Sequence, residues 1–276
     1  MNNITTDLCK IAEKYGTDKV SHGYTLYYDE SLKHLRNNKI NMLEIGIFRG
    51  GSILMWNEYF QKGEIYCIDN CIPNSTGHLL CNQSVLDNLN NYSERIHAYD
   101  CCQKDNIKME NIFSNITFDL IVDDGEHFQE HMLKSFGNLF KKVNSGGIYI
   151  IEDICTMWAF QTGSWWGQKN GIENTSRGKN LWLQKFIQNN KLEEEEVYKD
   201  SVWYVLHNYL KSNVFYSEYL SDDDNKYLTD NIENIEIIAA PGEREKYLHD
   251  NYNIPKYSGT LNTKLKSGCI AIIRKK

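Results

Sequence analysis

Proline and long apolar runs are both scarce in this sequence. Its 276 residues include three prolines, and no stretch rich in proline, glycine and serine divides the chain. The sequence therefore fits one large α/β domain with insertions, or one domain plus a small cap. A membrane span needs about 20 apolar residues in succession, and a signal peptide needs a basic flank before an apolar run. Neither pattern occurs, so we expect a cytoplasmic protein without a membrane partner.

An excess of basic residues is also missing, because the formal net charge is −7. Sequence-independent nucleic-acid binding requires a basic surface that displaces counterions, so we expect no nucleic-acid partner. The eight cysteines form no C-x-x-C pair, and Cys67 and Cys155 fall in or beside apolar runs. This pattern favours free, packed thiols over disulfides or a zinc site.

Short apolar runs with acidic ends occupy the middle of the sequence. The predicted strands and their acids are 42–45 with Glu44, 65–68 before Asp69, 96–99 before Asp100, 118–122 before Asp123 and Asp124, and 147–151 before Glu152 and Asp153. Helical stretches, clearest at 52–61 and 129–142, separate most of these runs. Apolar strands alternating with helices predict an α/β fold with a doubly wound, mostly parallel sheet. Right-handed crossovers place the carboxyl ends of such strands on one edge, where these folds bind ligands.

The amino-terminal residues 1–38 form a predicted helical cap, and residues 39–276 form the main domain. Helices are expected at 7–14 and 24–35, joined by a turn at 15–19. These helices could serve as a subunit contact in a homo-oligomer.

The pattern loosens beyond Asp153. Residues 155–180 predict a long loop, of a length typical of lids and binding segments. Trp158, Trp165 and Trp166 in this loop could form a platform for an acceptor, or pack in the core. A helix is expected at 181–189. Strands, some of them antiparallel additions to the sheet, are expected at 202–206, 214–216, 235–239 and 269–273.

A glycine turn follows the first predicted strand, in the sequence Leu43–Ser52. Phe48 stands where a dinucleotide-binding G-x-G-x-x-G loop has its second glycine, and it would obstruct a pyrophosphate. Glu44, two residues before Gly46, suits a cationic ligand with an amino group and a sulfonium. Asp69 could accept both hydroxyls of a ribose. The alternative is a tight strand–helix turn without a ligand.

Four segments together resemble class I S-adenosylmethionine-dependent methyltransferases, in the branch of the macrocin and mycinamicin sugar O-methyltransferases and their cephalosporin-hydroxylase-like relatives. They are Tyr15–Lys19 with His22–Tyr24, Leu43–Ser52, Ile121–His127 and Gly146–Asp153. The resemblance implies a Rossmann-like methyltransferase fold. The expected cofactor-binding residues are Tyr15, Thr17, Lys19, Glu44, Gly46, Arg49, Ser52, Asp69, Asp100, Gln103 and Asp123. His22 and Tyr24 are expected to contact the acceptor.

Three carboxylates at neighbouring strand ends, those of Asp124, Glu152 and Asp153, would repel one another unless a cation neutralised them. Oxygen ligands alone select a hard cation, so Mg²⁺ is expected, with Mn²⁺ or Ca²⁺ as alternatives. The resemblance implies the same metal site. In the alternative interpretation these acids cap a helix and accept backbone hydrogen bonds.

His127 lies three residues after Asp124, in the D-x-x-H spacing that the resemblance assigns to a general base. A cation on the acceptor hydroxyl lowers its proton affinity, and Asp124 and His127 together would form the catalytic pair. The alternative is a histidine that only caps its helix.

The sequence therefore predicts a metal-assisted O-methyltransferase that acts on a sugar hydroxyl. The acceptor is expected to be a nucleotide-sugar, a glycan or a glycosylated metabolite, with a role in capsule or surface-polysaccharide biosynthesis. A nicotinamide-dependent sugar reductase or epimerase is disfavoured by Phe48. A metal-dependent hydroxylase is disfavoured because no two-His-one-carboxylate set is visible. A non-catalytic interaction module would leave the acids and His127 without a purpose.

Overall fold

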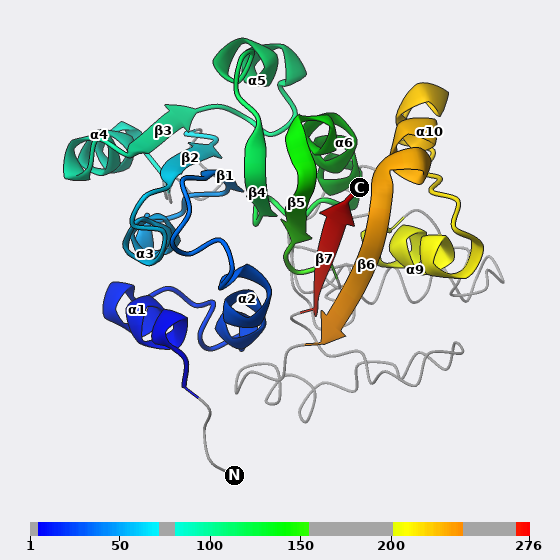
Figure 1. The fold of residues 1–276 in the computed structure, drawn as a ribbon. Helices are drawn as coiled ribbons and strands as arrows, with labels where there is room; N and C mark the ends of the chain where they lie inside the picture. Colours follow the sequence, from blue (N-terminus) through cyan, green and yellow to red (C-terminus); the bar gives the residue numbers. More distant parts are fainter. Residues whose placement is uncertain (1–4, 72–80, 155–200, 240–268) are drawn as a thin grey trace, which may run out of the picture. The chain divides into compact units, whose positions relative to one another are not determined.

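The computed structural model describes residues 5–71, 81–154, 201–239 and 269–276 (Figure 1). The chain divides into two compact units. The first comprises Met1–Gly125 and Lys142–Ile150, and the second comprises Glu126–Lys141 and Ile151–Lys276.

The first unit contains the parallel strands predicted from the acidic-ended runs. They are β1 (Asn41–Ile45), β2 (Glu64–Asp69), β3 (Ile96–Asp100), β4 (Phe118–Asp123) and β5 (Val143–Ile151), whose last residue belongs to the second unit. Their order is β3-β2-β1-β4-β5. β2 and β4 both pair in parallel with β1, and β3 pairs in parallel with β2. The predicted α/β fold class with a mostly parallel sheet is confirmed.

Five helices accompany these strands: α1 (Asp7–Tyr15), α2 (Tyr24–Leu32), α3 (Gly51–Tyr59), α4 (Gln83–Tyr92) and α5 (Asn106–Ile112). α1 has the signals of a well-capped helix, because the Thr6 side chain accepts from the backbone N–H of Cys9 and Gly16 ends the helix at φ 65°. α1 packs against α3, and the Tyr15 hydroxyl donates to Oε2 of Glu58 at 2.7 Å. The amino-terminal segment is thereby attached to the first helix after the glycine turn.

The second unit contains α6 (Gln129–Leu139), most of the short 3₁₀ helix η1 (Phe140–Lys142), α9 (Val202–Ser212), α10 (Asp222–Asn231), β6 (Ile232–Ala239) and β7 (Cys269–Lys275). β6 and β7 pair antiparallel. The strands expected at 235–239 and 269–273 and their antiparallel pairing are confirmed.

Two strand predictions in this unit are wrong. Residues 202–206 begin α9, because the Ser201 side chain caps the helix by accepting from Tyr204 N, and the buried side chains recur at helical spacing. Residues 214–216 lie outside any strand. The Phe215 N–H there donates to Oγ1 of Thr229 at 2.9 Å, a side-chain acceptor in place of a strand ladder.

The domain boundary expected near residue 38 stays a prediction, since the first unit includes both the amino-terminal helices and the sheet. The predicted loop at 155–180 and helix at 181–189 lie outside the described residues. Cys9, Cys67, Cys71, Cys81, Cys101 and Cys102 are free thiols. None of the helices described has the length and apolar character needed to cross a membrane.

Candidate active site

The glycine turn after β1 depends on the missing side chain of Gly46. This residue has φ 96°, and a Cβ added there would lie 2.0 Å from the backbone carbonyl oxygen of Asp124. The N–H of Asp124 in turn donates to the carbonyl of Ile45 at 2.9 Å. Glycine at position 46 therefore allows the loops after β1 and β4 to approach within backbone contact.

Asp69, at the end of β2, holds the same turn from the other side. Its Oδ2 accepts from the backbone N–H groups of Ile47 at 2.7 Å and Phe48 at 3.0 Å. Its Oδ1 accepts from Asn70 N at 2.6 Å. Burial raises the pKa of the Asp69 carboxyl, and these backbone donors oppose that rise. The residue predicted to bind a ribose thus also fixes the shape of the loop.

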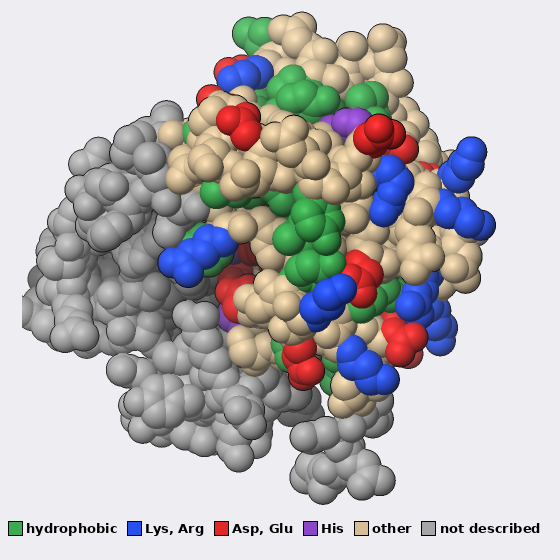
Figure 2. Space-filling model, turned by 90° about the vertical axis from the view of Figure 1, so that its left-hand side faces the viewer, with side chains coloured by type: hydrophobic (Ala, Val, Ile, Leu, Met, Phe, Trp, Pro, Cys, Tyr) green, Lys and Arg blue, Asp and Glu red, His purple; other side chains and the backbone are tan. Residues whose placement is uncertain are grey.

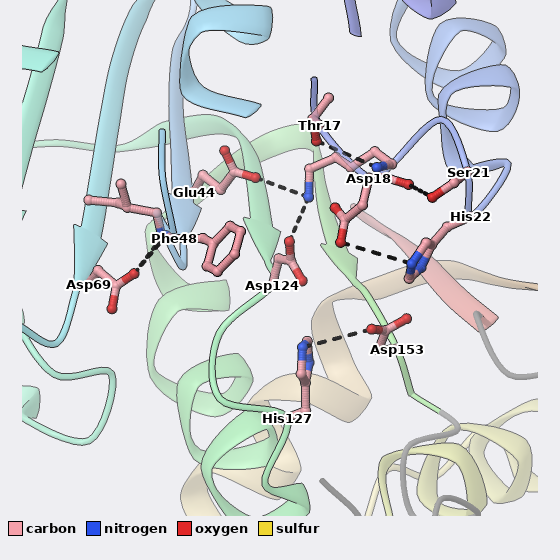
Figure 3. Close-up of polar contacts among 12 residues, drawn as sticks. Thr17, Asp18, Ser21, His22, Glu44, Phe48, Asp69, Asp124, His127 and Asp153 are labelled. Atoms are coloured by element: carbon pink, nitrogen blue, oxygen red, sulfur yellow. Dashed lines mark hydrogen bonds and ion pairs between the residues drawn. The ribbon is translucent and has the colours of Figure 1, made fainter. Parts of the chain in front are cut away.

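Glu44 and Asp124 both contact the ammonium group of Lys19 (Figure 3). Nζ of Lys19 lies 3.2 Å from Oε1 of Glu44 and 2.7 Å from Oδ2 of Asp124. The side chains of Lys19 and Glu44 are 1% and 0% exposed, whereas that of Asp124 is 26% exposed. Burial raises the pKa of Glu44 to about 7, and the charge of Lys19 opposes the rise. The edge of the sheet therefore already accommodates an alkylammonium group between two carboxylates.

Asp123 is placed differently from its neighbour Asp124. Its side chain is fully buried, and its Oδ2 accepts from the Tyr149 hydroxyl at 3.2 Å. Burial raises the pKa of that hydroxyl. The sequence argument missed Tyr149, whose position inside an apolar strand gives no signal of a polar role.

Four further residues predicted to bind the cofactor, Arg49, Ser52, Asp100 and Gln103, lie at or after the carboxyl ends of β1 and β3. Oδ1 of the exposed Asp100 accepts from Cys71 N at 3.2 Å. Gln103 is buried beside Gly125, where an added Cβ would lie 2.1 Å from its Oε1. The Arg49 guanidinium lies 5.2 Å from the centroid of the Phe48 ring. Ser52 lies in the first turn of α3.

Both amino-terminal residues predicted to contact the acceptor, His22 and Tyr24, are buried. Tyr24 is fully buried, and its ring lies 6.1 Å from that of Tyr28. His22 is 6% exposed, with Nε2 3.9 Å from Oδ2 of Asp18. Oγ1 of Thr17 accepts from Lys19 N at 3.5 Å. The packing of Tyr24 gives it a structural role that the sequence did not indicate.

The second unit holds the predicted base and two predicted metal ligands. Nε2 of His127 lies 3.8 Å from Oδ2 of Asp153 (Figure 3). His127, Asp153 and Glu152 are 8%, 8% and 2% exposed. His131 forms a separate ion pair with Glu126.

Backbone strain is concentrated in these loops. Among the described residues other than glycine, four have positive φ: Phe48 (52°), His127 (58°), Asp153 (52°) and Asn213 (56°). The first three lie in loops that directly follow β1, β4 and β5. Left-handed backbone at such residues costs roughly 1–3 kcal/mol each and is concentrated at functional sites, so these loops are strong candidates for the reaction site.

Most of the possible metal-ligand atoms at these strand ends are carboxylate oxygens. A carboxylate oxygen of Glu44 lies within 4.8 Å of a carboxylate oxygen of Asp124. A ring nitrogen of His127 likewise lies within 4.8 Å of a carboxylate oxygen of Asp153. The donor types fit a hard divalent cation and an ammonium-bearing cofactor. Trp158, Trp165 and Trp166 lie outside the described residues.

The surface carries charges of both signs. On the face shown in Figure 2, Lys and Arg side chains alternate with Asp and Glu. The absence of a nucleic-acid partner stays a prediction from the composition.

A family model described as a methyltransferase domain matches residues 43–154. Residues 43–154 are therefore similar to methyltransferase domains. The matched segment runs from β1 to the residue after Asp153, and so contains the glycine turn and the acids Asp123, Asp124, Glu152 and Asp153. The resemblance inferred from the sequence motifs is confirmed.

Curated relatives of this chain are named as O-methyltransferases. The mycinamicin VI 2''-O-methyltransferase of Micromonospora griseorubida is 32% identical over 160 residues, covering 54% of this chain and 36% of that protein. The 8-demethyl-8-alpha-L-rhamnosyl tetracenomycin-C 2'-O-methyltransferase of Streptomyces olivaceus is 29% identical over 189 residues, covering 65% and 44%. The chain spans less than half the length of these two relatives.

A solved structure shares the fold. The MycE methyltransferase of the mycinamycin pathway, in complex with Mg, SAH and mycinamycin VI, superposes with a TM-score of 0.60 at 21% identity, over 98% of this chain and 55% of that one. At this identity the likeness supports the fold alone.

Proposed function

We propose that this protein is an S-adenosylmethionine-dependent O-methyltransferase that methylates a sugar hydroxyl with the help of a divalent cation. The observation that carries the proposal is the buried Glu44 carboxylate beside the Gly46 turn, in a segment that matches a methyltransferase domain. A buried carboxylate favours a cationic ligand over a phosphate, since like charges repel.

The residues of the first unit bind the methyl donor. Glu44 pairs with the amino group of the donor, a role supported by its contact with the Lys19 ammonium at 3.2 Å. Asp69 accepts a ribose hydroxyl through the acceptor site of Oδ1 that its three backbone hydrogen bonds leave. Asp100 and Gln103 face the adenine. The Phe48 side chain, 53% exposed, supports a cofactor without a pyrophosphate.

Asp124, Glu152 and Asp153 hold the cation. Asp124 follows β4, the other two follow β5, and β4 and β5 are neighbours in the strand order. The chemistry that Mg²⁺ supplies when bound is to lower the proton affinity of a coordinated hydroxyl. All three residues offer the hard oxygen ligands that this ion prefers. Mn²⁺ and Ca²⁺ prefer the same ligands.

His127 removes the proton of the acceptor hydroxyl. The Asp153 carboxylate, 3.8 Å from Nε2 of His127, stabilises the imidazolium that forms. A neutral imidazole suits this step because its unprotonated ring nitrogen can accept the proton.

The acceptor is a sugar hydroxyl on a small molecule. The names of the relatives, which include a mycinamicin and a rhamnosyl tetracenomycin methyltransferase, support this class. A nucleotide-sugar acceptor, a role in capsule polysaccharide biosynthesis, a cytoplasmic location and a homo-oligomer remain predictions from the sequence.

Titration calorimetry tests the cofactor assignment. S-adenosylhomocysteine should bind and NADPH should not, because the glycine turn presents an acid and Phe48 to the ligand. Tight NADPH binding without S-adenosylhomocysteine binding would overturn the proposal in favour of a nicotinamide enzyme.

Two variants and a chelator test the chemistry. His127→Ala should abolish transfer of a labelled methyl group to sugar acceptors while cofactor affinity stays nearly unchanged. His131→Ala is the matched control, because it removes a second histidine near the start of the same helix. Methyl transfer that survives both chelation and Asp124→Asn would refute the metal site.

A further inference from the structure

Lys19 lies at the point where the proposed cofactor and metal residues meet within the first unit. Its ammonium contacts Oε1 of Glu44 and Oδ2 of Asp124, at 3.2 and 2.7 Å. Glu44 is proposed to bind the donor and Asp124 to bind the cation. The Lys19 ammonium therefore contacts one carboxylate that the methyl donor requires and one that the divalent cation requires.

The backbone around Lys19 is well fixed. Its carbonyl accepts from Tyr24 N at 2.9 Å, and Asp18 accepts from His22 N at 3.0 Å. The segment begins at Tyr15, whose hydroxyl is bonded to Glu58 on α3. The ammonium thus reaches the sheet edge from a held turn, and only its side chain can move away without unfolding this segment.

Two positive charges on one carboxylate oxygen repel each other strongly. A divalent cation bound through Oδ2 of Asp124 would be close to an ammonium that lies 2.7 Å from the same atom. Because the Lys19 side chain is only 1% exposed, water screens that repulsion poorly. Asp124 therefore accepts either the ammonium or the metal at this oxygen.

We propose that Lys19 is a competing counter-cation, which neutralises Glu44 and Asp124 in the ligand-free protein and is displaced from Asp124 when the divalent cation binds. Lys19 is then a positioning residue that sets the metal affinity of the site. The inference rests on the proposed function, because Asp124 is a metal ligand only there.

Calorimetric titration with MgCl₂ in the absence of cofactor and acceptor tests this role. Lys19→Gln removes the competing charge, so Mg²⁺ should bind about tenfold more tightly or better. Lys19→Arg keeps the charge and should leave the affinity near that of the wild type. Lys14→Gln is the matched control, because Lys14 pairs with Glu58 at 2.5 Å and its loss changes the net charge equally.

A second pair of variants guards against misfolding of Lys19→Gln, which leaves Glu44 buried without this cation. Glu44→Gln removes that buried charge, and Lys19→Gln in the Glu44→Gln background should again tighten Mg²⁺ binding relative to Glu44→Gln alone.

Unchanged or weaker Mg²⁺ binding after loss of the Lys19 charge, in either background, overturns the inference. Mg²⁺ binding that is lost in Asp124→Asn but indifferent to Lys19 overturns it while leaving the proposed metal site intact. A wild-type protein that binds no Mg²⁺ overturns both.

Discussion

The Tyr149 hydroxyl donates a hydrogen bond to Oδ2 of Asp123 at 3.2 Å, and both side chains are fully buried. The contact joins β5 to β4 inside the sheet. It separates Asp123, which stabilises the strands, from Asp124, which contacts Lys19 at the edge.

Tyr149→Phe should destabilise the protein by about 1–3 kcal/mol, because it removes one donor from a buried carboxylate. Urea unfolding measures the effect. Asp123→Asn in the Tyr149→Phe background should restore part of the loss, since the neutral amide costs less to bury. Tyr66→Phe, on the half-buried Tyr66, should change the stability by much less. A Tyr149→Phe protein as stable as the wild type would show that other contacts suffice for Asp123.

Gly46→Ala should destabilise the protein by roughly 3–5 kcal/mol. The new Cβ would lie 2.0 Å from the carbonyl oxygen of Asp124, in addition to the cost of a positive φ. Gly146→Ala provides the control, because Gly146 has φ 74° with nothing within 4 Å of its Cβ position. It should lose about 1–2 kcal/mol. Equal melting temperatures for the two variants would contradict the close approach of the β1 and β4 loops.

Asp69→Asn should loosen the glycine turn. The amide offers one acceptor where the carboxylate accepts from Ile47, Phe48 and Asn70. We expect a loss of about 1–3 kcal/mol in stability, and S-adenosylhomocysteine affinity about tenfold to a hundredfold weaker. Asp100→Asn changes an exposed acid with one such bond, and its stability should fall by less than about 1 kcal/mol. If Asp100→Asn is the more destabilised variant, Asp69 does not hold the loop.

The ionisation of Glu44 should make stability depend on pH. Its pKa rises from an ordinary 4.5 to about 7 in the folded protein, so the folded state holds this proton more tightly than the unfolded state does. The free energy of unfolding should therefore fall as pH increases from about 4.5 to about 7, by an amount on the order of 1–3 kcal/mol.

Glu44→Gln cannot ionise, so the difference in unfolding free energy between wild type and this variant isolates the effect. As pH rises from about 4.5 to about 7, Glu44→Gln should become more stable relative to the wild type. Affinity for S-adenosylmethionine should increase over the same range in the wild type, because the ionised carboxylate pairs with the amino group. Parallel pH profiles for the two proteins would contradict the shifted pKa.

The strands of the first unit could be predicted because burial on both faces leaves a direct signal in the sequence. Each run is apolar with an acid at or beside its carboxyl end, and parallel topology then places those ends at one edge. The same reasoning failed at 202–206, where apolar residues in a short window also fit a buried strand. The N-cap at Ser201 and the helical spacing of the buried residues as far as Tyr209 identify α9 only when a longer stretch of the sequence is considered.

The residue types of the candidate site could be predicted, but its internal contacts could not. Lys19 was expected to contact the cofactor, whereas the structure pairs it with Asp124, 105 residues further along the chain. Long-range ion pairs leave no periodic pattern. The Tyr149 hydroxyl is equally invisible, because a tyrosine in an apolar strand most often packs as a hydrophobic residue.

The long-range pairing of Lys19 has a consequence for the order of assembly. Lys19 is synthesised before Glu44 and long before Asp124, so its ion pairs can form only after both of those residues have been added to the chain. Contacts of such separation form late and slow the folding reaction. The turn that carries Lys19 is therefore expected to dock after β1 and β4 have paired, and protection of its amide hydrogens from exchange should appear in the last phase of refolding.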